Sequence, residues 1–118
     1  MPVSGIGGIF FRAQSPDTLK AWYATHLGIS MSWRDPWQQQ AGTTLVVPFA
    51  ADTTHIPAGK QWMFNFRVSE IGEMIARLKS AGIEILTDPT WDTPETGRFA
   101  RIHDPEGNAI ELWEPPAE

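Results

Sequence analysis

The chain has 118 residues, a formal net charge of −5 and no cysteine. This length suits one domain with a single core, and an apolar content of 42% excludes a disordered chain. The sequence has no thiols for disulfides or metal sites, and nine Lys and Arg residues are too few for a nucleic-acid-binding surface. No apolar run approaches the ~20 residues of a membrane span. The start MPVSGIGG does not resemble a signal peptide, so we expect a cytoplasmic location and no membrane association.

Two helices are predicted from the signals at their ends. The first has Ser15 as its N-cap and Pro16 at its first position, and it ends at Gly28. The second has Ser69 as its N-cap and ends at Gly82. The two start signals are 54 residues apart, and so are the two end signals. This spacing indicates an internal duplication, the alternative being a coincidence of two capped helices.

Each predicted helix lies between apolar segments that are typical of strands. These segments are Gly8–Ala13, Ile29–Trp33, Thr43–Phe49, Trp62–Val68, Ile83–Leu86, Phe99–Ile102 and Ala109–Trp113. Their order predicts two modules of strand–helix–strand–strand–strand, about residues 5–58 and 59–118, within one domain that spans residues 1–118.

The last two predicted strands form a hairpin. Their connection is too short for a crossover, so they must be antiparallel. The connection contains Asp104-Pro105-Glu106-Gly107, which suits a type I turn followed by a left-handed glycine. In that geometry Asp104 pairs with Asn108 and Arg101 lies opposite Glu111, whereas a slip of one residue would bring Arg98 there instead. The predicted fold class is α+β, with curved mixed or antiparallel sheets around a cavity and the helices outside.

The segment FARIHDPEGNAIELWEP, residues 99–115, together with LKAWYATHLGI, residues 19–29, resembles the vicinal oxygen chelate superfamily. That group includes glyoxalase I, bleomycin-resistance proteins and extradiol dioxygenases. The resemblance touches both ends and the repeated middle of the chain. It implies paired βαβββ modules, a cavity lined by both and often a dimer, but it is not specific for any one activity.

Metal enzymes of this superfamily carry four metal ligands on four strands. By the resemblance, only one of the four matching positions in this sequence holds a residue suited to such a metal. Glu111 matches the last ligand, whereas Gly8 and Met63 stand at two of the others. The strand Thr43–Phe49 should supply the fourth but contains no His, Glu, Asp or Gln. Glycine has no donor and a thioether suits soft metals, so we expect no metal and no cofactor. The alternative is a divalent metal held by a shifted set: His55, His103 and Glu111.

Strand alternation assigns Glu111 to the cavity, because Ile110 and Leu112 should lie under the helices. Arg101 and His103 should share the face of Glu111. One interpretation is a purely structural Arg101–Glu111 ion pair. The other is a polar patch of Glu111, Arg101 and His103 that contacts ligand or transfers a proton, so Glu111 and His103 are the candidate catalytic residues.

Further side chains are predicted to bind ligand. Arginine suits a carboxylate or phosphate because its fork donates two parallel hydrogen bonds, and in glyoxalase I an arginine matching Arg12 contacts the carboxylate of its glutathione substrate. Alternatively, Arg12 and Arg67 pair with surface acids such as Asp17 or Glu70. Trp33, Trp37 and Trp91 lie in or beside predicted loops and suit a pocket mouth and a dimer interface equally. The predicted ligand-binding residues are Phe10, Arg12, Trp37, Met63, Asn65, Arg67, Phe99, Arg101 and Trp113.

The leading hypothesis is a homodimer that binds a small, partly aromatic organic ligand, with or without an acidic group, in a metal-free cavity. One alternative is an enzyme of the superfamily: a lyase, isomerase or dioxygenase that uses a nonstandard metal site, or acid–base chemistry without metal. The second alternative is a protein-interaction module with an aromatic surface.

Overall fold

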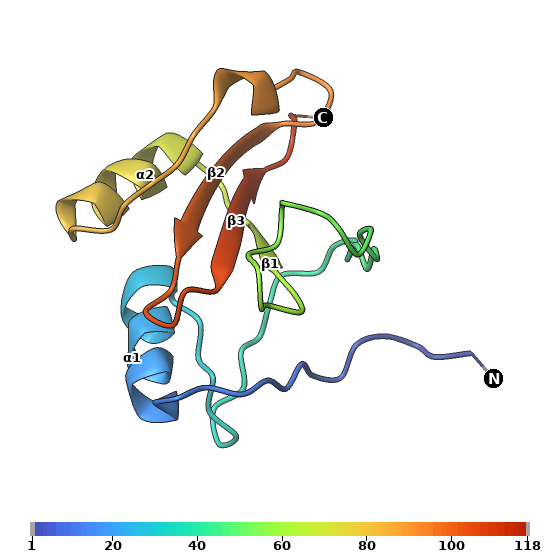
Figure 1. The fold of residues 1–118 in the computed structure, drawn as a ribbon, viewed down its shortest axis with the longest axis vertical. Helices are drawn as coiled ribbons and strands as arrows, with labels where there is room; N and C mark the ends of the chain where they lie inside the picture. The colour runs from blue at the N-terminus through green and yellow to red at the C-terminus, as the bar shows by residue number, and fades with distance from the viewer. Residues whose placement is uncertain (1, 118) are drawn as a thin grey trace.

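The structure is a computed structural model that describes residues 2–117, so both ends of the predicted domain 1–118 lie outside the described residues. Figure 1 shows the helices beside a small sheet. The elements in chain order are α1 (Pro16–Leu27), β1 (Phe64–Arg67), α2 (Ile71–Ser80), the 3-10 helix η1 (Pro89–Trp91), β2 (Arg98–His103) and β3 (Ala109–Glu114). The predicted α+β class is confirmed. Within residues 2–117, no helix is long and apolar enough to cross a membrane.

The predicted helix ends are confirmed in part. Gly28 terminates α1 in the left-handed conformation, at φ 67°, which glycine adopts without strain. The cap of α2 differs from the prediction by one residue, since Glu70 and not Ser69 occupies it, at φ 53°. A carboxylate from the far end of the chain completes this cap: Glu114 Oε1 accepts a hydrogen bond from the Ile71 N–H at 3.0 Å. The start of α2 is thereby tied to the end of β3.

The sheet has the order β1-β3-β2, with β3 parallel to β1 and antiparallel to β2. The predicted hairpin register is confirmed, because Arg101 lies opposite Glu111 and His103 opposite Ala109. The turn is closed as expected by a hydrogen bond from the Asp104 N–H to the Asn108 carbonyl, 3.0 Å. The sheet therefore places three neighbouring strands at known offsets around Glu111.

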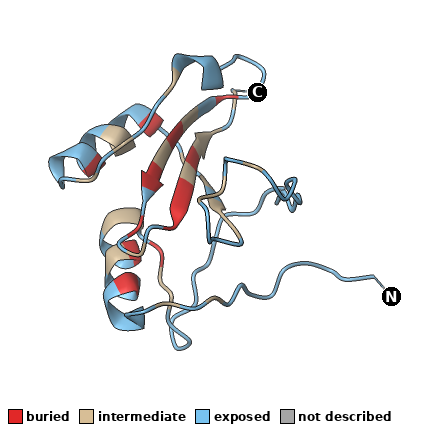
Figure 2. Cartoon of the chain, in the orientation of Figure 1, coloured by how far each residue is buried: buried red, intermediate tan, exposed pale blue. Residues whose placement is uncertain are grey.

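Both helices cover the same face of the sheet, and the core lies between them and the strands (Figures 1 and 2). Ile102, Ile110 and Leu112 are fully buried and belong to one apolar cluster with Tyr23 of α1 and Leu78 of α2. Complete burial of such a side chain contributes roughly 1.5–3 kcal/mol. Because side chains alternate along a strand, the opposite, helix-free face of the sheet receives the polar residues between them.

The strands predicted outside β1, β2 and β3 do not form ladders, and this part of the prediction is wrong for the structure described. Isolated bridges, Met31 with Pro36 and Leu86 with Arg101, stand in two of the expected places. The four affected segments are Gly8–Ala13, Ile29–Trp33, Thr43–Phe49 and Ile83–Leu86. Alternating or apolar sequence favours an extended chain, but hydrogen bonds to a neighbouring strand are what hold it. The predicted pair of βαβββ modules is accordingly not confirmed.

Candidate functional site

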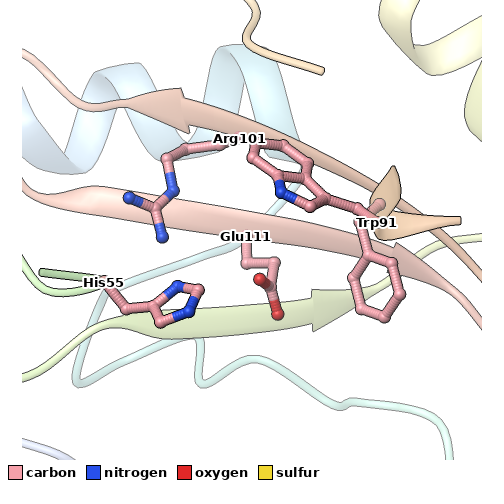
Figure 3. Close-up of a pocket in the computed structure, with 5 residues that line it drawn as sticks. His55, Trp91, Arg101 and Glu111 are labelled. Carbon is pink, nitrogen blue, oxygen red and sulfur yellow. The ribbon is translucent and has the colours of Figure 1, made fainter. Parts of the chain in front are cut away.

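A pocket of about 190 Å³ lies on the helix-free face of the sheet (Figure 3). Arg101 of β2 and Glu111 of β3 point into it from adjacent strands, and His55 reaches it from a loop. Two aromatic side chains, Phe99 of β2 and Trp91 of η1, complete its lining. The pocket therefore combines a carboxylate, a guanidinium and an imidazole with aromatic walls.

Glu111 and Arg101 face each other without forming an ion pair in the described structure. Glu111 Oε1 instead accepts a hydrogen bond from Asn65 Nδ2 at 2.6 Å, because the parallel register places Asn65 of β1 directly beside it. The Arg101 guanidinium donates to the sulfur of Met63 at 3.5 Å. The purely structural ion pair is thus absent among the described residues, where Asn65 uses one Glu111 oxygen and Met63 accepts from one Arg101 nitrogen.

The aromatic wall is held in place by its neighbours. Phe99 stacks on Trp113 with ring centroids 6.4 Å apart and planes 16° apart. The Trp113 indole donates to the Thr96 carbonyl at 2.7 Å, which fixes the orientation of its ring. On the other side, η1 presents Trp91, 37% of whose surface is exposed. These contacts orient a flat apolar surface beside the charged groups.

The 3-10 helix that carries Trp91 is capped by an aspartate. Asp88 Oδ1 accepts hydrogen bonds from the Thr90 N–H, 2.9 Å, and from the Thr90 hydroxyl, 2.8 Å. These bonds favour the ionised carboxylate, so the pKa of Asp88 lies below its ordinary value. The cap stabilises the start of η1, the 3-10 helix that carries Trp91.

Phe10 and Arg12 do not lie in the pocket of Glu111. They line a separate, wider cavity of about 680 Å³ together with Lys60 and Trp62. Phe10 is 79% exposed and stacks on Trp33 with centroids 5.6 Å apart. The structure thus divides the predicted ligand-binding residues between two places.

The remaining predicted residues also have specific neighbours. Arg67 donates to the Gln40 carbonyl at 2.8 Å and not to a surface acid. The Trp37 ring packs edge-on against Phe66, with centroids 5.9 Å apart. His103 is exposed next to the hairpin turn and does not line the pocket of Glu111.

Sequence analysis named His55 only in the shifted metal set and Trp91 only as a candidate for a pocket mouth or a dimer interface, and the structure brings both to the pocket. His55 lies in the loop after the 43–49 segment, where its ring packs against Phe49 at 5.8 Å. Trp91 follows the proline that opens η1. Neither position follows a strand or helix period, so no pattern in the sequence predicts the direction of the side chain.

The donor set does not fit the divalent metal of the superfamily. Within residues 2–117, no group of three His, Cys, Asp or Glu side chains could hold a metal ion. Gly8 offers no donor, and the Met63 thioether, a soft ligand, accepts from Arg101. His103 lies away from the pocket of His55 and Glu111, so the shifted metal set does not assemble.

The fold and the pocket define a small α+β protein with a ligand-sized hollow on the open face of a mixed sheet. The chain belongs to the Glyoxalase/Bleomycin resistance protein/Dioxygenase superfamily, whose family model matches residues 5–112. The resemblance seen in the sequence is thereby confirmed. Among curated proteins, no sequence matches the chain significantly.

Comparison with solved structures supports the same fold. The crystal structure of TnmS3, an antibiotic binding protein from Streptomyces sp. CB03234, matches with a TM-score of 0.60 and 23% sequence identity. The match covers 98% of each chain. At this level of identity the likeness concerns the fold and not the ligand.

Proposed function

We propose that this protein binds a small, partly aromatic organic ligand in the pocket formed by His55, Trp91, Phe99, Arg101 and Glu111. The observation that carries the proposal is the pair Arg101 and Glu111, which lie opposite each other on adjacent strands without pairing. Two half-buried charges of opposite sign that do not neutralise each other are suited to recognising a ligand.

The free atoms of the pair indicate the chemistry of the ligand. The Glu111 oxygen that Asn65 does not use accepts hydrogen bonds and so favours a hydroxyl or N–H group. The Arg101 guanidinium donates and so favours a carboxylate or another oxygen acceptor. With Phe99 and Trp91 alongside, the matching ligand has one aromatic ring with a donor at one end and an acid or carbonyl at the other.

The size of the pocket agrees with a ligand of this kind. A cavity of about 150 Å³ accommodates benzene, and this pocket measures about 190 Å³. The antibiotic binding recorded for TnmS3 supports a binding role for this fold, while the ligand of the present chain is inferred from its own side chains.

The proposal can be tested with three related probes: 4-hydroxybenzoate, 4-hydroxybenzamide and benzoate. Isothermal titration calorimetry should show saturable binding of 4-hydroxybenzoate. Loss of a hydrogen bond to a charged group costs about 1.5–3 kcal/mol, or roughly 10- to 150-fold in affinity. Arg101→Gln should therefore weaken 4-hydroxybenzoate much more than 4-hydroxybenzamide, and Glu111→Gln should weaken both while leaving benzoate nearly unchanged.

Arg98→Gln is the matched control, because Arg98 is an exposed arginine on the same strand and outside the pocket. It should leave all three affinities within about twofold. No saturable binding of any probe at millimolar concentration, or equal losses in Arg98→Gln and Arg101→Gln, would refute the proposed site.

Glu111 is the acceptor best placed to take a proton from a bound ligand, and a catalytic role for His103 stays a prediction. We also propose that the binding unit is a homodimer. The cytoplasmic location expected from the sequence stays a prediction.

A further inference from the structure

The wider cavity, of about 680 Å³, has no part in the proposed function. It lies between residues 10–12, residues 59–62 and Asn108, the residue that follows the turn of the β2–β3 hairpin. We call it the turn cavity. Its volume falls within the range of about 300–1,000 Å³ that is typical of small-molecule sites.

The turn cavity is separate from the pocket of Glu111. No residue lines both of them. Asn108 precedes Glu111 by three residues, which is about 10 Å along an extended chain. The Asn108 amide also faces α1, because its Nδ2 donates to Asp104 Oδ2 at 2.8 Å and the same oxygen accepts from Tyr23. The two hollows are therefore different candidate sites.

A buried amide presents an acceptor to the turn cavity. Asn108 is only 7% exposed, and its backbone N–H and its Nδ2 both donate to the Asp104 carboxylate. Because a carboxylate accepts, Nδ2 faces Asp104 and the side-chain oxygen Oδ1 points away from it. Among residues 2–117, no donor contacts Oδ1, and no buried side-chain nitrogen or oxygen lacks a partner. Oδ1 is therefore accessible from the cavity that Asn108 lines, where it suits an N–H or O–H group.

Two cations line the turn cavity, and no acidic residue lines it. Arg12 and Lys60 are both exposed there. Lys60 Nζ donates to the Glu106 carbonyl at 3.0 Å, which holds the ammonium group beside the hairpin turn. Two cations without an acid favour a group with two negative charges, such as a phosphate, over a single carboxylate.

Aromatic side chains form much of the remaining wall. Phe10, Phe11 and Trp62 line the cavity, and Trp62 packs against Phe11 and Phe64 with ring centroids 4.7 and 4.6 Å apart. The parallel register pairs Phe64 with Ile110. Continued back by two residues, it brings Trp62 level with Asn108. A flat ring that carries a donor can therefore pack on the aromatic wall and reach Asn108 Oδ1.

We propose that the turn cavity is a second binding site, for a nucleoside monophosphate whose base carries an amino group, such as AMP. The base packs on the aromatic side chains and its amino group donates to Asn108 Oδ1, while Arg12 and Lys60 bind the phosphate. Asparagine contacts the amino group of adenine through the same oxygen in protein–DNA complexes. The proposal does not rest on the proposed function of the pocket of Glu111.

Isothermal titration calorimetry with AMP, adenosine and ribose 5-phosphate tests the site. AMP should bind saturably and more tightly than either fragment. Arg12→Gln should weaken AMP by at least about tenfold and leave adenosine within about twofold, because it removes a charged contact with the phosphate. Arg98→Gln is the control, since Arg98 is exposed and lies outside both cavities. No saturable binding of AMP at millimolar concentration, or equal losses in Arg12→Gln and Arg98→Gln, would overturn the proposal.

Two further comparisons separate ligand contacts from effects on the fold. Lys60→Gln should weaken AMP, and Lys60→Arg should restore its affinity by restoring the charge. Asn108 is tested by changing the ligand, because replacement of this buried side chain would disturb the hairpin. Purine riboside 5′-monophosphate lacks the amino group and should bind about 2- to 10-fold more weakly than AMP. Equal affinities of these two nucleotides would overturn the contact with Asn108.

An NMR titration locates the nucleotide and separates this proposal from the proposed function. AMP should shift the Trp62 indole and Asn108 amide signals and leave the Trp91 and Trp113 indole signals unchanged. Saturating 4-hydroxybenzoate should not displace AMP. Displacement, or shifts at Trp91 in place of Trp62, would overturn a second site. Failure of 4-hydroxybenzoate alone to bind would refute the proposed function, while AMP binding with the Arg12 dependence described above would still support the turn cavity.

Discussion

Removal of a single hydroxyl group tests how the hairpin that carries Arg101 and Glu111 is held to the helices. Tyr23 of α1 is fully buried, and its hydroxyl donates to Asp104 Oδ2 at 2.7 Å. Asp104, 5% exposed, begins the hairpin turn. Its carboxylate also accepts from the Asn108 amide at 2.8 Å and from the N–H groups of Glu106 and Asn108. Tyr23→Phe removes one of these four bonds and keeps the aromatic ring.

The expected loss in the free energy of unfolding follows from the charge of Asp104 and from the three hydrogen bonds that its carboxylate keeps. A hydrogen bond to a charged group contributes about 1.5–3 kcal/mol. In Tyr23→Phe three donors still form hydrogen bonds with the Asp104 carboxylate. We therefore expect a loss at the lower end of this range, about 1.5 kcal/mol. Urea unfolding at pH 7 measures the loss as a lower midpoint with an unchanged slope. A loss below about 0.5 kcal/mol would show that the Tyr23–Asp104 bond does not stabilise the fold.

The buried Tyr23 hydroxyl, hydrogen-bonded to Asp104, also makes the free energy of unfolding depend on pH in the alkaline range. Burial, together with the hydrogen bond to Asp104, raises the pKa of Tyr23 far above its ordinary value. Above pH ~10 the unfolded tyrosine loses its proton while the folded one keeps it, so the free energy of unfolding falls by up to about 1.4 kcal/mol per pH unit. Tyr23 is the only tyrosine of the chain, so Tyr23→Phe should lack this component and the difference between the two proteins should shrink as the pH rises. Parallel pH profiles would refute the reasoning.

Five further outcomes are expected. Glu106→Ala should lower the free energy of unfolding by about 1–3 kcal/mol, because the Glu106 carboxylate accepts from the two backbone N–H groups before α1 at 2.7 and 2.9 Å; urea unfolding measures this. Gly97→Ala should destabilise the fold by about 1–3 kcal/mol in the same assay, since Gly97 has φ 100° and an added Cβ would overlap the Glu114 carbonyl. An unchanged urea midpoint would contradict the hydrogen bonds of Glu106 in the first variant and the overlap with Glu114 in the second. An NMR titration of the Asp88 carboxyl should show a midpoint below that of Asp in a model peptide, and Asp88→Ala should weaken 4-hydroxybenzoate binding by releasing Trp91. Dialysis against EDTA should leave that affinity unchanged, and a loss restored by a divalent metal would contradict the metal-free pocket.

The hairpin shows which parts of the site are readable from sequence. The residues Asp104 to Gly107 specify the turn through local backbone preferences, and the turn fixes the register of the strands on both sides. Alternation then assigns Ile110 and Leu112 to the core and Glu111 to the opposite face. Both steps depend on neighbours in the chain, and the structure confirms both.

The hydrogen-bond partner of Glu111 could not be predicted from the sequence in this way. Asn65 is 46 residues away in sequence, and only the parallel pairing of β1 with β3 brings it within 2.6 Å. By charge the arginine directly opposite is the stronger partner, but Arg101 contacts Met63 instead. The choice between two acceptable partners depends on how the three strands pack together, which pattern and propensity do not resolve.

Local signals along the chain are enough to predict the two helices, the closing hairpin and the side of the sheet to which Glu111 belongs. These follow from periodicity, caps and turn residues, all of which act over a few positions, whereas the superfamily was inferred from the resemblance of residues 19–29 and 99–115. The tertiary structure decided that Glu111 is held by Asn65, that His55 and Trp91 join the pocket, and that Phe10 and Arg12 lie outside it. It also decided that the apolar 43–49 segment forms no ladder within residues 2–117. A strand needs a partner beside it, and which partner it meets depends on the whole arrangement and not on the strand's own residues.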